Sequence, residues 1–211
     1  MKLASKTFKD GGVIPGRCSF CIKAPRGKIT LGRNRNPELH WSEAPAATRS
    51  FVLLVIDGDA PNPKPANVNT EGSVLSPKLS RGEFTHWLMV DIPATVEAIE
   101  EGACSDGVVA KGKRLPRGPA GSRQGVNDYT AWFGDDKDMG GPYHGYDGPC
   151  PPWNDSLAHH YRFELYATDL ERCGVDGAFR LADVHKALEG HILDRAVLNG
   201  RYALNPAIRL R

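Results

Sequence analysis

Three apolar segments dominate the hydrophobic pattern of this chain. Residues 51–56 form an unbroken run, FVLLVI, that is largely β-branched or aromatic and too short for a typical helix. Such a run favours a strand that is covered on both faces. A second run, FTHWLMVDI, spans residues 84–92, whereas apolar and polar side chains alternate in YRFELYA, residues 161–167. The alternation is typical of a strand in a sheet with two different faces, so all three segments are predicted strands.

Shorter extended segments surround these three. Gly and Pro break the first 50 residues into brief apolar pieces, a pattern typical of short strands with irregular links. We expect strands near residues 3–8, 18–22, 29–31 and 39–41, with further candidates at 104–109 and 201–211.

Helical spacing is confined to a few places. Leu181, Val184, Ala187 and Leu188 recur at helical spacing, and Gly190 follows them, which predicts a helix that ends at this glycine. Residues 94–101 and 191–199 are two further helix candidates, each followed by a glycine. The pattern therefore predicts a mainly β fold, with sheet packed on sheet and helices at the periphery, including C-terminal helices.

Two aspartates follow the first apolar run. Asp57 and Asp59 flank Gly58, and Ala60 and Pro61 come next. Glycine permits positive φ, whereas proline fixes φ and holds the preceding residue extended, so we expect the strand to end here in a defined acidic turn. The two carboxylates can bind a cation, act as acid and base, or accept backbone N–H groups in an Asx-type turn. The sequence leaves these alternatives open.

Three stretches lack any regular period. Residues 62–82 are rich in Asn, Pro, Ser and Gly and are predicted to form a long loop beside the acidic turn. Residues 111–123, KGKRLPRGPAGSR, hold five basic residues and no acidic one, which indicates a solvated loop or a contact for an acidic partner. Residues 125–152 combine Gly, Pro and Asp with several aromatic residues, as in a packed, folded-back loop.

Length and charge narrow the class of protein. The 211 residues, 40% hydrophobic and 25% charged, suit one globular domain spanning residues 1–211. The formal charge of +2 gives no reason to expect nucleic acid or a membrane surface as a partner. The N-terminal segment lacks the apolar core of a signal peptide, and no window is apolar enough to span a membrane, so we expect a cytoplasmic protein.

The cysteines fit that expectation. There are five, an odd number, at positions 18, 21, 104, 150 and 173, which does not resemble a secreted disulfide framework. Cys18 and Cys21 form a C-x-x-C pair without a second pair, a weak signal for zinc or redox chemistry. Cys150 is expected to be a packed structural cysteine, with a reactive thiol as the alternative.

Polar residues cluster at the ends of the predicted strands. Asp57 and Asp59 follow one strand, His86 stands near the start of the next, and His159 and His160 precede the third. If these ends meet, they form a small pocket with carboxylates and imidazoles. Residues 148–152, GPCPP, come shortly before the histidine pair and predict a rigid rim, in which Gly148 and Cys150 can still offer backbone N–H groups to an anion.

Taken together, these motifs resemble those of the phosphatidylethanolamine-binding protein family, in its bacterial and archaeal branch. The matching segments are Asp57-x-Asp59-Ala60-Pro61, His86-Trp87, Gly148-Pro149-Cys150-Pro151-Pro152 and His159-x-Tyr161. Further likeness at Phe8, Ile14-Pro15, Pro37-Glu38-Leu39, Trp41-Ser42 and His191-Ile192-Leu193 extends it over nearly the whole chain.

The resemblance implies a fold and a site. The fold is two antiparallel sheets packed as a Greek-key sandwich with peripheral helices, and the site is a small pocket for phosphate-like or carboxylate-like groups such as a phosphoethanolamine head. Carried over residue by residue, the ligand-binding positions are Asp57, Asp59, Pro61, His86, Gly148, Pro149, Cys150, Pro151, His159 and Tyr161. No metal and no cofactor is implied.

The sequence departs from the family pattern at several positions. Gly58 stands in place of the usual proline, His160 in place of the usual arginine, and residues 154–158 in place of a glycine-containing turn. His159, two residues before Tyr161, occupies the family's histidine position, but His160 beside it competes for the same role, so the sequence leaves open which of the two faces the pocket. Residues 127–144 form a longer loop than usual, so we expect the mouth to be partly covered.

The leading functional hypothesis is a non-catalytic binding protein with a regulatory role. The aspartates would orient the imidazoles, which would in turn hold the anion. In this role the protein would bind a protein partner of the kinase or protease class. Exposed sheet edges would also permit a homodimer. The alternatives are a protease or kinase inhibitor acting through the loop at residues 111–123, and a metal-dependent phosphoester hydrolase that uses the Asp and His side chains.

Overall fold

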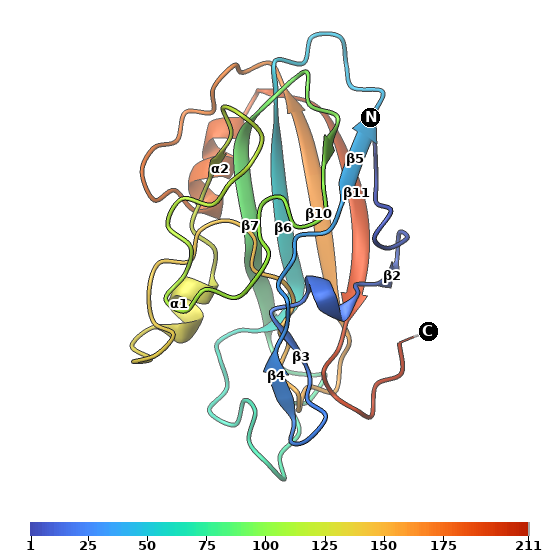
Figure 1. Ribbon diagram of the computed structural model, residues 1–211, viewed down its shortest axis with the longest axis vertical. Coiled ribbons are helices and arrows are strands. Elements are labelled where there is room, and N and C mark those ends of the chain that lie inside the picture. The colour runs from blue at the N-terminus through green and yellow to red at the C-terminus, as the bar shows by residue number, and fades with distance from the viewer. Residues whose placement is uncertain (211) are drawn as a thin grey trace.

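The core of the molecule is a six-stranded sheet, seen in the computed structural model, which describes residues 1–210 (Figure 1). Its long strands lie side by side and pair antiparallel, and the short strand β2 joins one edge in parallel. In spatial order the strands are β2 (Gly12–Val13), β11 (Ile192–Tyr202), β10 (His159–Thr168), β6 (Ser50–Pro61), β7 (Arg81–Pro93) and β9 (Arg123–Gln124).

Smaller elements cover this sheet. A three-stranded sheet consists of β1 (Lys2–Ala4), β5 (Leu39–Ser42) and β8 (Ala98–Ile99), and a separate hairpin consists of β3 (Cys21–Lys23) and β4 (Ile29–Leu31). The helical elements are a 3-10 turn, η1 (Gly16–Cys18), and two helices, α1 (Tyr129–Phe133) and α2 (Leu181–Leu188). The prediction of a mainly β fold with two sheet layers and peripheral helices is confirmed.

Both faces of β6 are buried, as its apolar run predicts. Phe51, Leu53 and Val55 face the core shared with Leu39 and Trp41 of the small sheet. The alternate residues Val52, Leu54 and Ile56 face the second core, which Val184 and Leu188 of α2 cover. None of the six β6 side chains is more than 1% exposed, so the run carries apolar packing on both sides of the sheet.

Two predicted helices are wrong. Residues 192–199 lie in β11, which pairs with β10 from Ile192 to Tyr202, and His191 is in the turn before it. Here Ala196, Leu198, Gly200 and Tyr202 are buried at every second position, the period of a strand. Residues 94–101 form turns and the short strand β8, because Trp41 of β5 donates its N–H to Glu97 and so recruits the segment to the small sheet.

The other predictions of local structure are partly right. The predicted end of the first strand at Asp57 is wrong, since β6 continues to Pro61 by shifting its register between Asp57 and Ala60. Residues 104–109 contain no strand, and of 201–210 only the first two are in β11. The short strands near residues 3, 21, 29 and 39, the loop after Pro61 and the helix at 181–188 are confirmed.

Candidate functional site

A pocket lies near one end of the central sheet, with about 310 Å³ of empty space, its mouth included. Strand pairing creates it: Asp57 of β6 stands opposite Phe84 of β7 and opposite Tyr161 of β10. Its walls comprise Asp57, Ala60, Pro61, Phe84, His86, Tyr129, Trp132, Cys150, Pro151, Pro152, His159 and Tyr161. The structure thus brings together seven of the ten positions that the sequence indicated.

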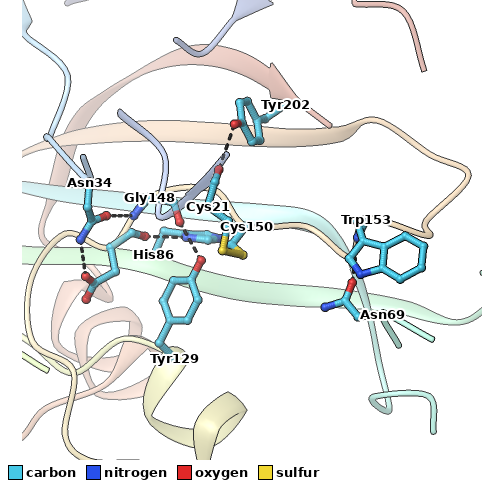
Figure 2. Close-up of a disulfide and its surroundings, with 10 residues drawn as sticks. Cys21, Asn34, Asn69, His86, Tyr129, Gly148, Cys150, Trp153 and Tyr202 are labelled. Atoms are coloured by element: carbon cyan, nitrogen blue, oxygen red, sulfur yellow. Dashed lines mark hydrogen bonds between the residues drawn. A yellow bond between two sulfur atoms is a disulfide. The ribbon is translucent and has the colours of Figure 1, made fainter. Parts of the chain in front are cut away.

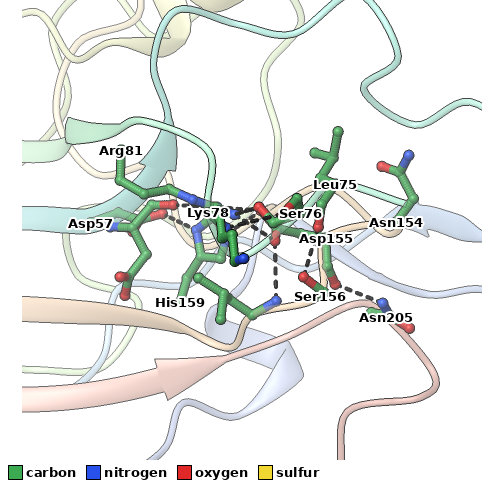
Figure 3. A network of polar contacts seen from close by, with 12 residues as sticks. Asp57, Leu75, Ser76, Lys78, Arg81, Asn154, Asp155, Ser156, His159 and Asn205 are labelled. Carbon is green, nitrogen blue, oxygen red and sulfur yellow. Dashed lines mark hydrogen bonds and ion pairs between the residues drawn. The ribbon is translucent and has the colours of Figure 1, made fainter. Parts of the chain in front are cut away.

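His159 is the centre of a buried chain of ion pairs (Figure 3). Its Nδ1 lies 2.6 Å from Oδ2 of Asp57, and its Nε2 lies 3.2 Å from Oδ2 of Asp155. Arg81 closes the chain with Nη1 2.6 Å from the same Asp155 oxygen. Because carboxylates only accept hydrogen bonds when ionised, both ring nitrogens of His159 are donors and the ring is an imidazolium.

The pKa values of His159 and Asp155 agree with a protonated His159 ring between two ionised carboxylates. Burial by itself would lower the pKa of His159, but the charge of Asp57 and the hydrogen bonds to Asp155 and Asp57 outweigh burial and raise it to about 9. Burial would raise the pKa of Asp155, yet the hydrogen bonds from His159 and Arg81 lower it to about 2. The four charges of Asp57, His159, Asp155 and Arg81 therefore cancel, and His159 has no N–H left for a ligand.

Asp59 and His160 lie outside the pocket walls. The exposed His160 ring has Nδ1 2.8 Å from Oδ2 of Asp59, which also accepts the His160 backbone N–H. Asp57 accepts the backbone N–H of Asp59 through Oδ1 at 2.8 Å. Of the two histidines between which the sequence did not decide, His159 lines the pocket and His160 does not. Asp59, expected at the pocket, is not among its lining residues, because the register shift after Asp57 turns Asp59 toward His160.

His86 is oriented by a backbone carbonyl rather than by an aspartate side chain. Its Nδ1 lies 2.7 Å from the Asp147 carbonyl oxygen, and the Asp147 N–H donates to the His86 carbonyl. Burial lowers the pKa of His86, although the charges of Asp57 and Asp128 and the contact with Asp147 act in the opposite direction. The buried ring is therefore neutral at pH 7.

Asp147 is itself fixed by three donors. Asn34 and Lys113 donate to Oδ1 at 2.7 and 2.6 Å, and Asn127 donates to Oδ2 at 2.9 Å. Burial raises the pKa of Asp147 despite the Lys113 charge. Asp147 was not among the predicted site residues, and only its position directly before the GPCPP segment signals its role.

Gly148 and Pro149 support the rim from behind. The Gly148 N–H donates to Oδ1 of Asn34 and its carbonyl accepts from the Tyr129 hydroxyl (Figure 2). A Cβ at Gly148 would lie 2.0 Å from the Cys18 carbonyl oxygen, so only glycine is accommodated. The expectation that Gly148 offers its N–H to an anion, and that Gly148 and Pro149 line the pocket, is wrong. The Cys150 N–H has no acceptor among residues 1–210 and stays a candidate donor.

Cys150 joins the rim covalently to the β3–β4 hairpin. It forms a disulfide with Cys21, a pairing that the sequence analysis did not foresee (Figure 2). Cys150 is therefore a structural cysteine and not the reactive thiol that was the alternative, and Cys21 is not paired with Cys18, which is a buried free thiol. Burial raises the pKa of the Cys18 thiol to about 12, so it is no ready nucleophile.

Aromatic side chains from the irregular segment cover part of the pocket, as expected from its length. Tyr129 and Trp132 of α1 line one wall, and Phe84 packs edge-on against both rings. Lys64, from the loop after β6, places Nζ 4.1 Å from the centre of the Trp132 ring. The sequence showed the aromatic density of this segment but not the helix, because α1 is only one turn long.

Tyr161 presents an unusual polar atom. Its hydroxyl is buried and has no hydrogen-bond partner among residues 1–210, while its ring lies edge-on to His86 at 5.2 Å between centres. Burial raises the pKa of Tyr161 far above its ordinary value, so the hydroxyl keeps its proton. An unpaired buried hydroxyl is costly, and a ligand in the pocket would give it a partner.

The basic loop at residues 111–123 lies away from the pocket walls. Lys113 binds Asp147 and Arg123 binds Asp91, so two of its cations are paired within the protein. Leu115 at its tip is 95% exposed. In the described part of the chain, no group of three or more His, Cys, Asp or Glu side chains is arranged to hold a metal ion. No helix among these residues is long and apolar enough to cross a membrane.

Comparisons with known proteins agree with the geometry. The sequence profile of the family described as phosphatidylethanolamine-binding protein matches residues 4–203. A UPF0098 protein of Methanothermobacter thermautotrophicus is 32% identical over 202 residues, which cover 96% of this chain and 98% of that relative. The UPF0098 protein YbcL of Escherichia coli is 34% identical over 163 residues, 77% of this chain and 66% of YbcL.

Solved structures show the same fold. The crystal structure of E. coli YbcL, described as a new member of the mammalian PEBP family, superposes with a TM-score of 0.68 at 28% identity and covers 96% of this chain and 97% of YbcL. A PEBP homologue from Chlamydia trachomatis superposes with a TM-score of 0.62 at 24% identity, with 95% of each chain covered.

Proposed function

The chain belongs to the phosphatidylethanolamine-binding protein family, and we propose that its pocket binds a small phosphate-like or carboxylate-like ligand without catalysing a reaction on it. A regulatory role, in which the occupied pocket changes the affinity for a protein partner of the kinase or protease class, is part of this proposal.

One observation carries the proposal: two polar atoms without protein partners in the same pocket. The Tyr161 hydroxyl is unpaired, and no residue among 1–210 hydrogen-bonds Nε2 of His86, whose other nitrogen is fixed by Asp147. Buried polar atoms are normally paired, so a buried unpaired Tyr161 hydroxyl in the same apolar pocket wall as the unpaired Nε2 of His86 is the pattern of a ligand site.

Asp57 and His159 shape the pocket and do not contact the ligand in this proposal. The two carboxylate oxygens of Asp57 accept hydrogen bonds from His159 and from the Asp59 N–H. The two ring nitrogens of His159 donate to Asp57 and Asp155. This ion-pair chain forms a rigid, charge-balanced floor, and the ligand contacts belong to His86, Tyr161 and the Cys150 N–H.

Calorimetric titration of the protein with inorganic phosphate at pH 6 tests the proposal. We expect saturable binding with one site, and Tyr161→Phe should weaken it about tenfold because a hydrogen bond to a charged group is lost. The same variant should not lower the free energy of unfolding, since the hydroxyl it removes has no partner.

Tyr146→Phe is the matched control. The Tyr146 hydroxyl is buried and donates to the Cys18 carbonyl at 2.5 Å, outside the pocket walls. This variant should lower the free energy of unfolding by about 1 kcal/mol and leave phosphate affinity unchanged. The absence of phosphate and acetate binding by the wild-type protein, or equal affinities of wild type and Tyr161→Phe, would contradict the proposal.

A further inference from the structure

The tripeptide Pro-Arg-Gly occurs twice in this chain, at residues 25–27 and at residues 116–118. A serine protease with a carboxylate in its specificity pocket cuts the peptide bond that follows an arginine. Such an enzyme binds its substrate as an extended segment, held by main-chain hydrogen bonds. The two Arg–Gly bonds have the same chemistry, so the surrounding backbone decides which of them a protease can reach.

The first Pro-Arg-Gly is the closed tip of the β3–β4 hairpin. Ala24 donates its N–H to the Lys28 carbonyl at 3.3 Å and so closes the turn. Within the turn Gly27 has a φ of 87°, in the left-handed region. The backbone on both sides of Arg26 is therefore curved, and a protease would have to open the hairpin before it could bind this bond.

The second Pro-Arg-Gly lies in an open loop. Residues 114–118 belong to no strand or helix, and the chain makes no turn and no sharp bend through residues 116–118. No residue from 113 to 120 has a positive φ, and Leu115 is 95% exposed. Exposed loops of this kind are the preferred sites of proteolytic nicking.

Few contacts hold the backbone at Arg117. The N–H groups of Arg117 and Gly118 have no acceptor among residues 1–210, and the exposed Arg117 side chain makes no hydrogen bond or ion pair with any of these residues. Gln124 restrains the loop, because its Nε2 donates to the Arg117 carbonyl at 2.7 Å and to the Pro116 carbonyl at 3.3 Å. A protease must replace this hydrogen bond with those of its oxyanion hole, which is a smaller change than opening a hairpin.

Arg114, in the same loop, is the poorer candidate. On its N-terminal side Lys111 and Gly112 have φ values of 65° and 82°, so the chain that a protease would bind before the bond is not extended. Lys113, directly before Arg114, is held by its Nζ contact with the buried Asp147 at 2.6 Å. The geometry therefore favours the bond after Arg117 over the bond after Arg114.

We propose that the Arg117–Gly118 bond is a processing site for an arginine-specific serine endoprotease. The protease oxygen forms an ester with the Arg117 carbonyl carbon, the C–N bond breaks, and Gly118 leaves as an amine that takes the proton of the protease hydroxyl. Water then hydrolyses the ester, which yields the Arg117 carboxylate and restores the protease. This inference is independent of the ligand proposed for the pocket.

The product is a nicked protein whose two pieces stay joined. Cys21 precedes the cut and Cys150 follows it, so their disulfide links the pieces until it is reduced. The fold should survive the cut, because residues 114–118 contribute to none of the sheets.

Trypsin is a suitable probe, because it cuts after Lys and Arg and the chain holds 27 of these residues. With native protein we expect the first cut at Arg117–Gly118, at least tenfold faster than at any other bond. Mass spectrometry should show a single species that is one water heavier before reduction. After reduction it should show two fragments, residues 1–117 and 118–211.

Two variants compare the two Pro-Arg-Gly segments directly. Arg117→Gln should slow the first cut at least tenfold, whereas Arg26→Gln, the matched control, should leave its rate unchanged. Both arginine side chains are exposed and make no hydrogen bond or ion pair within residues 1–210, so both variants should fold like the wild-type protein.

Three results would overturn the proposal: a first cut at any other bond, including those after Arg26 and Arg114, resistance of the native protein to trypsin, or inhibition of trypsin while the Arg117–Gly118 bond stays intact. The last result would identify an inhibitory loop, and the hydrolysis of a small chromogenic substrate, followed in the same mixture, detects it. None of these results bears on phosphate binding, which the titration of the wild-type protein tests separately.

Discussion

The side chain that most affects the character of the site is His159, which balances two buried carboxylates. Asp57 and Asp155 are 3% and 1% exposed, and each would be costly in the interior without a charged partner. Because His159 contacts both, the protein holds a permanent imidazolium at neutral pH. The sequence motifs alone suggested a different arrangement, in which the His159 imidazole hydrogen-bonds to the ligand.

The charge on His159 predicts how stability depends on pH. Its folded-state pKa is about 9, above the ordinary value, so its contribution is fully present below about pH 6.5 and is lost as the pH rises toward 9. We expect the free energy of unfolding in urea to fall by roughly 3 kcal/mol between these values. In His159→Gln this fall should be absent, and an unchanged slope in that variant would show that another group is responsible.

Strand parity explains which residues of the site were predictable. His159 and Tyr161 are two residues apart in β10 and both line the pocket, while His160 between them faces away, as alternation requires. Asp57 and Asp59 are also two apart, but the bulge in β6 breaks their parity. A bulge is set by the pairing of two strands, so the separation of these aspartates could not be predicted from their spacing.

At the scale of elements, β11 shows how tertiary pairing overrides a local pattern. Its N-terminal half reads as a helix because apolar residues are bunched, yet β10 offers it a full partner strand and β2 pairs with its far end at Gly200. Gly200 lies against the side chains of Ile14 and Phe8, so the N-terminal segment packs directly on the β11 backbone.

Gly200→Ala tests this packing. A Cβ at Gly200 would lie 2.6 and 2.7 Å from Ile14 side-chain carbons, and overpacking of this kind costs about 1–3 kcal/mol of unfolding free energy. Gly174→Ala is the control, since nothing lies within 4 Å of its Cβ position. Chemical denaturation of both variants should show a loss only for Gly200→Ala, and equal stabilities would mean that the N-terminal segment does not hold this position.

At the scale of the whole molecule, the sequence predicted the fold better than it predicted the hydrogen-bond donors and acceptors of the pocket. The apolar run of β6 and the alternation of β10 indicate a layered β structure because these patterns reflect burial, and the order of the motifs indicates the same fold through the resemblance to the family. The donors and acceptors of the pocket depend on Asn34, Lys113 and Asp147, which come from distant segments and carry no recognisable pattern. The cytoplasmic location predicted from the sequence remains a prediction, and the disulfide is more typical of oxidising compartments.

The Cys21–Cys150 disulfide gives a prediction at the same scale. The two cysteines are 129 residues apart, and closing a loop of this length stabilises a protein by up to about 5 kcal/mol through the entropy of the unfolded chain. Addition of a phosphine reductant should therefore lower the urea midpoint of the wild-type protein. The double variant Cys21→Ala, Cys150→Ala should have the lower midpoint with or without reductant. A wild-type midpoint that does not change on addition of reductant would show that the disulfide does not stabilise the protein.

The bridge also closes residues 21–150 into a covalent ring, with residues 1–20 before the ring and a C-terminal tail after it. Asp57 and His86 belong to the ring, whereas His159 and Tyr161 belong to the tail. The pocket exists only where β10 of the tail is docked against β6 of the ring. A ligand held between His86 and Tyr161 would therefore act as a clamp between the two parts, and its affinity would report how firmly the tail is docked.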